Sequence, residues 1–99
     1  MMYATLIAID VRGVDREEGL RGLREGIVPA ISAMPGFHSG VWRTGNDTNI
    51  GLSLTVWESE AGAQAMAERF GVGSSPQANA AVTRCEVREV AATAGPPGQ

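Results

Sequence analysis

The chain has 99 residues, a net charge of −3 and a hydrophobic fraction of 43%, which fits one folded domain and excludes a disordered segment. Because it is weakly acidic and has no cluster of Lys and Arg, we expect neither a nucleic acid nor an anionic membrane as partner. One Cys and one His exclude a disulfide framework and a Cys/His metal site. The sequence has no signal-peptide pattern and no apolar run of about 18 residues, so a cytoplasmic location is expected.

The first part of the chain predicts a strand followed by a helix. Tyr3–Val11 alternates with apolar residues on both faces, as in a strand covered on both sides. Asp15 and Glu18 form a variant of the capping box, so the helix is expected to begin near Arg16. Its predicted buried stripe consists of Leu20, Leu23, Ile27 and Ile31. Pro29 removes a backbone donor, so we expect a kink or an irregular turn.

Pro35 and Gly36 end this helix, and a strand over Phe37–Thr44 follows. We expect Gly36 to have a positive φ. Simple alternation puts these side chains on one face of the strand: Phe37, Ser39, Val41 and Arg43. It puts these on the other face: His38, Gly40 and Trp42.

A polar turn over 45–49 then predicts a hairpin with a third strand. One row of the third strand is apolar and is expected to meet the helices: Ile50, Leu52, Leu54 and Val56. The opposite row is small or hydroxyl-bearing and ends in a Trp: Gly51, Ser53, Thr55 and Trp57. This second row either lines a pocket or faces water.

The last part of the chain predicts a helix and a final strand. Ser59 caps the helix, and Gly71 ends it. The helix has an apolar stripe: Ala63, Met66, Ala67 and Phe70. The final strand runs from about Ala81 to Val90 and holds Cys85, which we interpret as a packed core thiol. Residues 94–99 are expected to form a flexible C-terminal tail, so the domain covers 1–93.

The order strand, helix, strand, strand, helix, strand predicts a small α+β unit. A sheet that is apolar on both faces, with only two helices, needs a partner to cover one side. The sequence therefore predicts a homodimer with an enclosed pocket.

Two stretches resemble the antibiotic biosynthesis monooxygenase family of dimeric α/β-barrel proteins. They are Met34-Pro35-Gly36-Phe37, with Pro29 upstream, and Thr55-Val56-Trp57-Glu58-Ser59. The resemblance runs from about Tyr3 to Val90. It implies a ferredoxin-like βαββαβ protomer with a four-stranded antiparallel sheet, and two such sheets packed into a dimeric α/β barrel. Members of the family include cofactor-independent oxygenases acting on polycyclic aromatic compounds, haem-degrading oxygenases, isomerases and proteins of no known activity.

The resemblance also bears on cofactors. The haem-degrading branch uses a Trp at the position of Trp57, which this chain matches. It also uses an Asn in the first strand and a His late in the second helix. Neither residue type occurs in Tyr3–Val11 or Glu60–Phe70. No flavin, nicotinamide or metal motif is present either, so no cofactor and no metal are expected.

The aromatic-oxygenase branch binds its substrate with Asn, Trp, Tyr and Arg side chains. The substrate-binding candidates that this implies are Trp57, Trp42, Tyr3 and Arg84. His38 is the candidate catalytic base because an imidazole titrates near neutral pH. Other interpretations stay open: a core position for Trp57, a dimer contact for Trp42, pairing of Arg84 with Glu86, and a solvent-facing His38. No Asn falls within a predicted strand, which departs from this branch.

Two functions are compatible with these residues. The first is a cofactor-independent oxygenase acting on a small or polycyclic aromatic compound, which needs a base and a desolvated cavity. The alternative is a non-catalytic dimeric protein that binds a small molecule or serves as an accessory protein.

Overall fold

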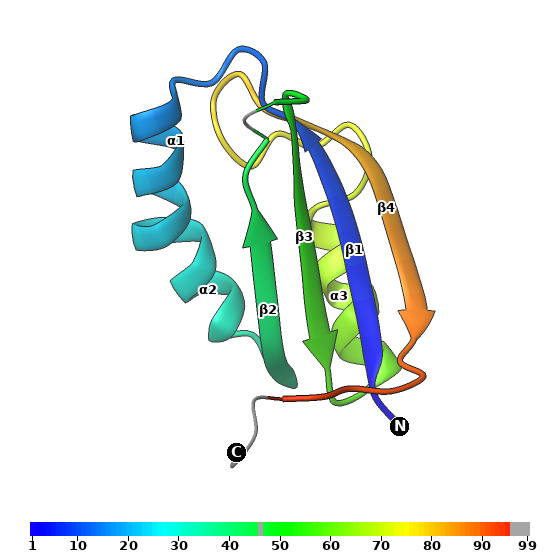
Figure 1. Cartoon of the computed structure of the whole chain (residues 1–99). Helices are drawn as coiled ribbons and strands as arrows, with labels where there is room; N and C mark the ends of the chain where they lie inside the picture. Colours follow the sequence, from blue (N-terminus) through cyan, green and yellow to red (C-terminus); the bar gives the residue numbers. More distant parts are fainter. Residues whose placement is uncertain (46, 96–99) are drawn as a thin grey trace.

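The structure is a computed structural model that describes residues 1–45 and 47–95, and its fold is ferredoxin-like (Figure 1). Four antiparallel strands form one sheet in the order β2–β3–β1–β4. The strands are β1 (Tyr3–Asp10), β2 (Phe37–Arg43), β3 (Ile50–Trp57) and β4 (Ala81–Glu89). The helices are α1 (Arg16–Gly22), η1 (Leu23–Ile27), α2 (Val28–Ser32) and α3 (Glu60–Arg69). The predicted α+β fold and its βαββαβ order are confirmed, whereas assembly into a dimeric barrel stays a prediction.

The segments α1, η1 and α2 form one helical arm whose winding changes before Pro29. In η1 the turn is π-helical, and the N–H of Val28 donates to the carbonyl of Leu23, five residues back. Pro29 offers no N–H, and a proline ring crowds the carbonyl four residues before it. A wider turn relieves this crowding. The irregular turn predicted near Pro29 is confirmed.

Both predicted helix starts are capped as expected. Asp15 Oδ1 accepts a hydrogen bond from Glu18 N at 3.1 Å, and α1 begins directly after it. Ser59 Oγ accepts from Gly62 N at 3.3 Å at the start of α3. Each cap supplies a partner for one of the free N–H groups of a helical first turn.

The two faces of β3 are the reverse of those expected from the sequence. Ser53, Thr55 and Trp57 are buried on the inner face, with exposed fractions of 5%, 0% and 0%. Leu54, from the row expected to meet the helices, is 43% exposed. The expectation for this strand was therefore wrong, and the apolar row lies on the outer face of the sheet.

Hydrogen bonds explain why the hydroxyl-bearing row can be buried. Thr5 of β1 lies opposite Thr55 in the register, and its Oγ1 donates to the carbonyl of Ala63 in α3 at 2.9 Å. Thr55 Oγ1 accepts from Trp57 Nε1 at 2.9 Å and donates to the carbonyl of Thr5 at 3.4 Å. Buried polar groups cost little when they are paired in this way. The pattern of apolar side chains alone does not predict these hydrogen bonds.

A bulge changes the expected faces of β2 as well. The register with β3 shifts between Phe37 and Ser39. As a result Phe37 lies on the inner face, where its ring meets that of Trp57 edge-on at a centroid distance of 5.5 Å. His38 lies at the bulge and is exposed. The expected grouping of Phe37 with Ser39 on one face was wrong because the extra residue resets the alternation.

The core lies between the inner face of the sheet and the helices. Its fully buried members come from β1, α2, β3, α3 and β4: Ile7, Ile31, Trp57, Ala63, Met66 and Val82. Cys85 packs against this core and is half-buried, as predicted. Burial, followed by the charge of Glu86, raises the pKa of the Cys85 thiol.

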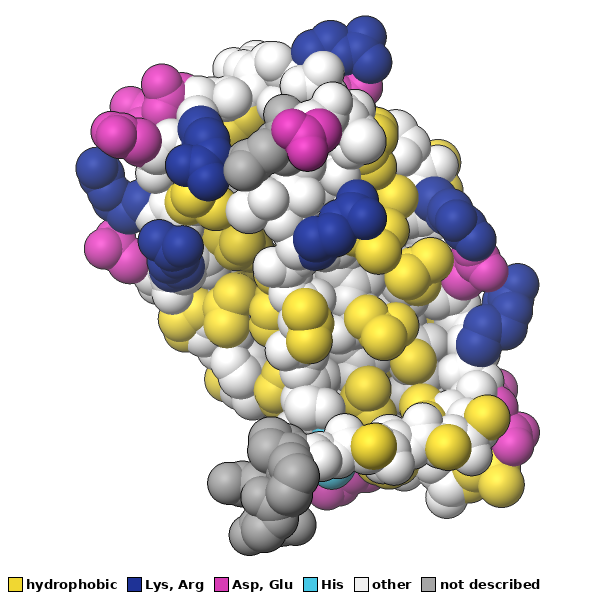
Figure 2. All heavy atoms as spheres, in the orientation of Figure 1, with side chains coloured by type: hydrophobic (Ala, Val, Ile, Leu, Met, Phe, Trp, Pro, Cys, Tyr) yellow, Lys and Arg dark blue, Asp and Glu magenta, His cyan; other side chains and the backbone are white. Residues whose placement is uncertain are grey.

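The outer face of the sheet is largely apolar, and none of the helices in residues 1–45 and 47–95 covers it. Figure 2 shows apolar side chains gathered over its middle, with charged side chains towards the edges. Val41 and Leu54 lie opposite each other in the register and are 69% and 43% exposed. At the β4 edge Arg84 and Arg88 both pair with Glu86, the second at 3.2 Å. The expectation that one sheet face lacks a cover within the chain agrees with this geometry.

The chain leaves the sheet after β4. Val90 N donates to the carbonyl of Met2 at 2.9 Å, and residues 91–95 form neither helix nor strand. Most of the tail predicted at 94–99 and Asn46 of the predicted turn lie outside the described residues. Within 1–45 and 47–95, no helix is long and apolar enough to cross a membrane.

Gly36 has a φ of +80°, as predicted. A Cβ added there meets no atom within 4 Å, so any cost of substitution comes from the backbone conformation alone. We expect Gly36→Ala to lower the free energy of unfolding by about 1 kcal/mol. Urea denaturation measures this change.

Gly26 is the matched control for this experiment. A Cβ added there also meets no atom within 4 Å, but Gly26 lies in the helical arm and its φ is not positive. We expect Gly26→Ala to leave stability unchanged or to raise it by up to about 1 kcal/mol. An equal loss in both variants would contradict the backbone explanation.

Candidate functional site

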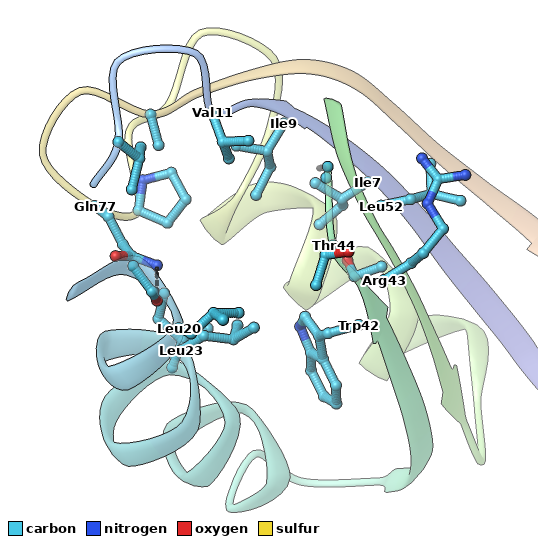
Figure 3. A pocket seen from close by; sticks show the side chains of 18 of the residues that line it. Ile7, Ile9, Val11, Leu20, Leu23, Trp42, Arg43, Thr44, Leu52 and Gln77 are labelled. Atoms are coloured by element: carbon cyan, nitrogen blue, oxygen red, sulfur yellow. Dashed lines mark hydrogen bonds between the residues drawn. The ribbon is translucent and has the colours of Figure 1, made fainter. Parts of the chain in front are cut away.

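A cavity of about 350 Å³ lies between the helical arm and the sheet (Figure 3). Much of its wall is apolar and comes from both layers, including Ile7, Ile9, Leu20, Leu23, Ile27 and Phe70. The stripe predicted to be buried on the first helix therefore faces a hollow. Of its four members only Ile31 is fully buried. The spacing of apolar residues indicated which helix face turns inward, but it could not distinguish a cavity from a packed core.

Gln77, in the loop after α3, closes one side of this cavity. Its Nε2 donates to the carbonyl of Gly19 in α1 at 3.2 Å. A Cβ added at Gly22 would lie 3.1 Å from Gln77 Oε1, so the absence of a side chain on this turn lets the loop approach. Sequence analysis missed Gln77, because nothing in its local pattern places it beside a helix 58 residues earlier.

Trp42 of β2 forms part of the sheet side of the cavity. Its indole nitrogen faces the hollow, as Figure 3 shows. Within 1–45 and 47–95, no hydrogen bond reaches its Nε1. The six-membered ring lies over Gly40, where an added Cβ would come within 2.8 Å of Trp42 Cη2 and Cζ3. Gly40 thus sets the position of the ring. Among the predicted binding residues, Trp42 is the one that the structure places at the cavity.

Trp57 lies in the core and not in the cavity wall. It is 0% exposed, and its Nε1 is paired with Thr55. It packs so closely on α3 that a Cβ added at Gly62 would lie 3.1 Å from Trp57 Cε3. The structure therefore corresponds to the core interpretation of Trp57 rather than to the expected substrate contact.

Tyr3 also lies outside the residues that line the cavity. It sits opposite Trp57 at the start of β1 and packs against the core. A hydrogen bond to the Glu60 carboxylate, followed by its negative charge, raises the pKa of Tyr3. Tyr3 therefore lies beside the core and outside the cavity wall.

His38 and Arg84 are not cavity residues either. His38 is exposed, and its Nδ1 lies 2.9 Å from Ser39 Oγ. Arg84 lies on the outer face and pairs with Glu86, as its alternative interpretation held. The predicted base and the predicted arginine are therefore not brought together with Trp42.

The row of β3 that contains Ser53 divides between two environments. Gly51 and Ser53 line the cavity, which agrees with the pocket interpretation of this row. Thr55 and Trp57 lie deeper, under α3. This division arises because α3 packs against one end of the strand, whereas the cavity lies next to the other end.

Among the described residues that line the cavity, the ionisable ones are arginines: Arg12, Arg16 and Arg43. Arg12 lies 3.8 Å from Asp10. Arg43 Nη2 donates to the carbonyl of Ile50 at 3.1 Å, and its guanidinium points away from the hollow (Figure 3). Within 1–45 and 47–95 no three His, Cys, Asp or Glu side chains are grouped to hold a metal ion. The site is thus an apolar cavity with no acid–base side chain in its described wall.

Comparison with solved structures supports the fold. A haem-degrading protein from Mycobacterium tuberculosis, crystallised free of haem, superposes with a TM-score of 0.63 at 20% identity, covering 96% of this chain and 100% of that one. A candidate monooxygenase from Shewanella loihica PV-4 superposes with a TM-score of 0.55 at 22% identity, covering 94% and 99%. The chain shares their fold. No protein-family model matches the sequence, and no curated protein matches it.

The first of these similarities raises the question of whether the cavity fits a haem. Proteins hold haem iron with His, Cys, Tyr or Met. The only His, Cys and Tyr of the chain are His38, Cys85 and Tyr3, and none of them lines the cavity. Met66 does, but it is 1% exposed and packed in the core. The donor set of the cavity therefore does not fit a haem.

Thr55→Val tests the structural role of Trp57. The change keeps the shape of the side chain but leaves Trp57 Nε1 without its partner in the core. We expect the free energy of unfolding to fall by about 1–3 kcal/mol, the usual cost of an unpaired buried donor. Thr83→Val is the control, since its hydroxyl bonds the Ala8 carbonyl at an exposed position, and we expect a loss below about 0.5 kcal/mol. Equal losses in urea denaturation would contradict the role assigned to Thr55.

Proposed function

We propose that the protein binds a flat aromatic compound in the cavity and acts on it as a cofactor-independent oxygenase. The observation that carries this proposal is the cavity between the helical arm and the sheet, apolar over most of its wall. Its volume of about 350 Å³ falls within the range of roughly 300–1,000 Å³ that ligand sites occupy. Trp42 offers an aromatic surface on one side. The fold shared with a candidate monooxygenase supports the choice of chemistry.

The described cavity wall contains no side chain that could act as a base, so the substrate must ionise readily by itself. Anthrones and hydroquinones lose a proton readily without help from a protein base. The substrate anion then supplies the electrons that reduce O₂. For an anthrone, two hydrogens leave the methylene carbon, one oxygen atom becomes the new carbonyl, and the other leaves as water. The cavity would keep bulk water away from the anion.

The same lack of an acid–base side chain supports a second candidate, a non-catalytic protein that binds an aromatic molecule. The two candidates share the cavity and differ only in whether O₂ is consumed. They are therefore separated by one measurement of binding and one of oxygen uptake.

We also propose that the protein is a homodimer formed through the outer face of the sheet. The exposed pair Val41 and Leu54 lies near the middle of this face, beside Leu6 of β1. Large apolar patches that a chain leaves uncovered commonly mark an association surface. A stable interface of this kind buries roughly 1,600 Å² in total.

Oxygen uptake with anthrone tests the catalytic proposal. We expect uptake above the protein-free rate, with one O₂ consumed per anthrone. Leu23→Trp should abolish it, because the larger ring fills the cavity. His38→Ala should leave it unchanged, because His38 does not line the cavity.

Two other results would change the catalytic proposal. Binding of anthrone without uptake would favour the non-catalytic candidate. A fall in rate of about a hundredfold in His38→Ala, the usual size of a general-base effect, would restore His38 as the base.

Sedimentation equilibrium tests the dimer with a matched pair of variants. Val41 and Val72 are both 69% exposed, but Val41 lies on the outer face of the sheet and Val72 in the loop after α3. We expect the wild type and Val72→Glu to sediment as two copies of the 10.3 kDa chain. Val41→Glu should shift the protein towards single chains, because it places a charge in the apolar contact. A wild type that sediments only as single chains at micromolar concentration would overturn the proposal.

A further inference from the structure

We infer that Trp42 Nε1 and Ser53 Oγ together bind one oxygen atom of the ligand, so that the cavity selects flat aromatic compounds carrying a hydroxyl or carbonyl group at that end. This inference rests on the proposed binding of an aromatic compound in the cavity. It adds the chemical group by which such a compound would be recognised.

The register brings the two side chains together. Trp42 of β2 lies directly opposite Ser53 of β3, and both line the cavity. Side chains in such opposite positions have Cβ atoms about 4.5–5.5 Å apart. Ser53 is only 5% exposed, so what reaches it does so through the cavity. One small group of a ligand can therefore meet both side chains at once.

Both polar atoms lack a partner within the described part of the chain. No hydrogen bond of Ser53 Oγ or Trp42 Nε1 is present there. Among the described residues, Ser74 Oγ is the one fully buried side-chain polar atom without a partner, so the atoms of Ser53 and Trp42 are accessible and can be reached by a ligand. The contrast with Trp57 is direct, because its Nε1 is bonded to Thr55 at 2.9 Å. The fold pairs one indole N–H internally and leaves the other directed into the hollow (Figure 3).

The chemistry of the pair limits what it can bind. An indole N–H can only donate, whereas a serine hydroxyl can donate or accept. A ligand oxygen would accept from Trp42 Nε1 and would either accept from Ser53 or donate to it. Both a carbonyl and a phenolic hydroxyl satisfy these requirements. Ile7, opposite Ser53 on β1 and 1% exposed, offers no competing polar group.

Gly40 positions the donor. A Cβ at this residue would lie within 2.8 Å of two ring carbons of Trp42 and 3.2 Å from Thr55 Cγ2. Thr55 is fully buried and cannot yield, so the indole ring must move. Gly40→Ala therefore displaces Trp42 Nε1 while it leaves both polar groups in the protein.

Equilibrium binding of two probes to the full chain tests the inference. The probes are 2-naphthol and 2-methylnaphthalene, which are similar in size and differ in the hydroxyl group. The measured quantity is the ratio of their affinities. We expect Trp42→Phe and Ser53→Ala each to lower this ratio by about three- to tenfold, because each removes a hydrogen bond that 2-naphthol can form and 2-methylnaphthalene cannot. Gly40→Ala should lower it in the same direction.

Thr44→Val is the matched control, because it removes a hydroxyl from another part of the cavity wall and should leave the ratio unchanged. An unchanged ratio in Trp42→Phe and Ser53→Ala, with both probes still bound, would overturn the inference and leave the proposed cavity standing. If neither probe binds the wild type, the proposed function fails and the inference fails with it.

A spectroscopic readout keeps the inference testable if a variant does not fold. The chain has two tryptophans, so the indole N–H region of a ¹⁵N spectrum holds two signals. We expect 2-naphthol to move the Trp42 signal to lower field as its N–H gains a hydrogen bond, while the Trp57 signal stays in place. A Trp42 signal that responds equally to 2-methylnaphthalene would overturn the inference.

Discussion

The rest of the structure depends on a chain of hydrogen bonds that ties the sheet to α3. Trp57 Nε1 donates to Thr55, Thr55 donates to the backbone of Thr5, and the Thr5 hydroxyl donates to the carbonyl of Ala63. Because each polar atom has a partner, three hydroxyl or indole groups can lie in the core without the cost of an unpaired donor. The chain of bonds links β1, β3 and α3, and so determines which side of the sheet becomes the interior. The apolar row of β3 is left outside as a consequence.

Which face of the sheet is buried determines both the exposed outer face and the cavity on the inner side. On the outside it produces an apolar sheet face with Leu54 and Val41 exposed, the surface proposed for dimerisation. On the inside α3 covers one end of the sheet, and the helical arm stands away from the other end and leaves the cavity. The π-helical turn before Pro29 and the contact of Gln77 with α1 set the path of that arm. A second copy and a ligand would thus occupy opposite faces of one sheet.

The side chains of the cavity wall limit the reactions that the protein could catalyse there. The described residues of this wall offer apolar surface, arginines and a few neutral polar groups, but no imidazole, carboxylate, thiol or phenol. A reaction there has to draw on the acidity of the substrate itself, which is why anthrones and hydroquinones are the proposed substrates. Recognition by Trp42 and Ser53 would place the oxygen of such a compound at the sheet and its apolar body against the helical arm.

The sequence by itself determined the order of the elements, the caps at Asp15 and Ser59, the positive φ of Gly36 and the irregular turn near Pro29, because each depends on residues within one or two turns of chain. Its prediction of an α+β fold agrees with the structure, and Trp42, a candidate that came from the family resemblance, lines the cavity. Only the tertiary structure decided which face of β3 is buried, that Trp57 belongs to the core and that Gln77 closes the cavity. These outcomes depend on hydrogen bonds between residues about 50 or more positions apart, such as Thr5 with Ala63. The local spacing of residues shows which face of a strand is more apolar. It does not show whether residues far along the chain will form hydrogen bonds with the polar side chains on the opposite face.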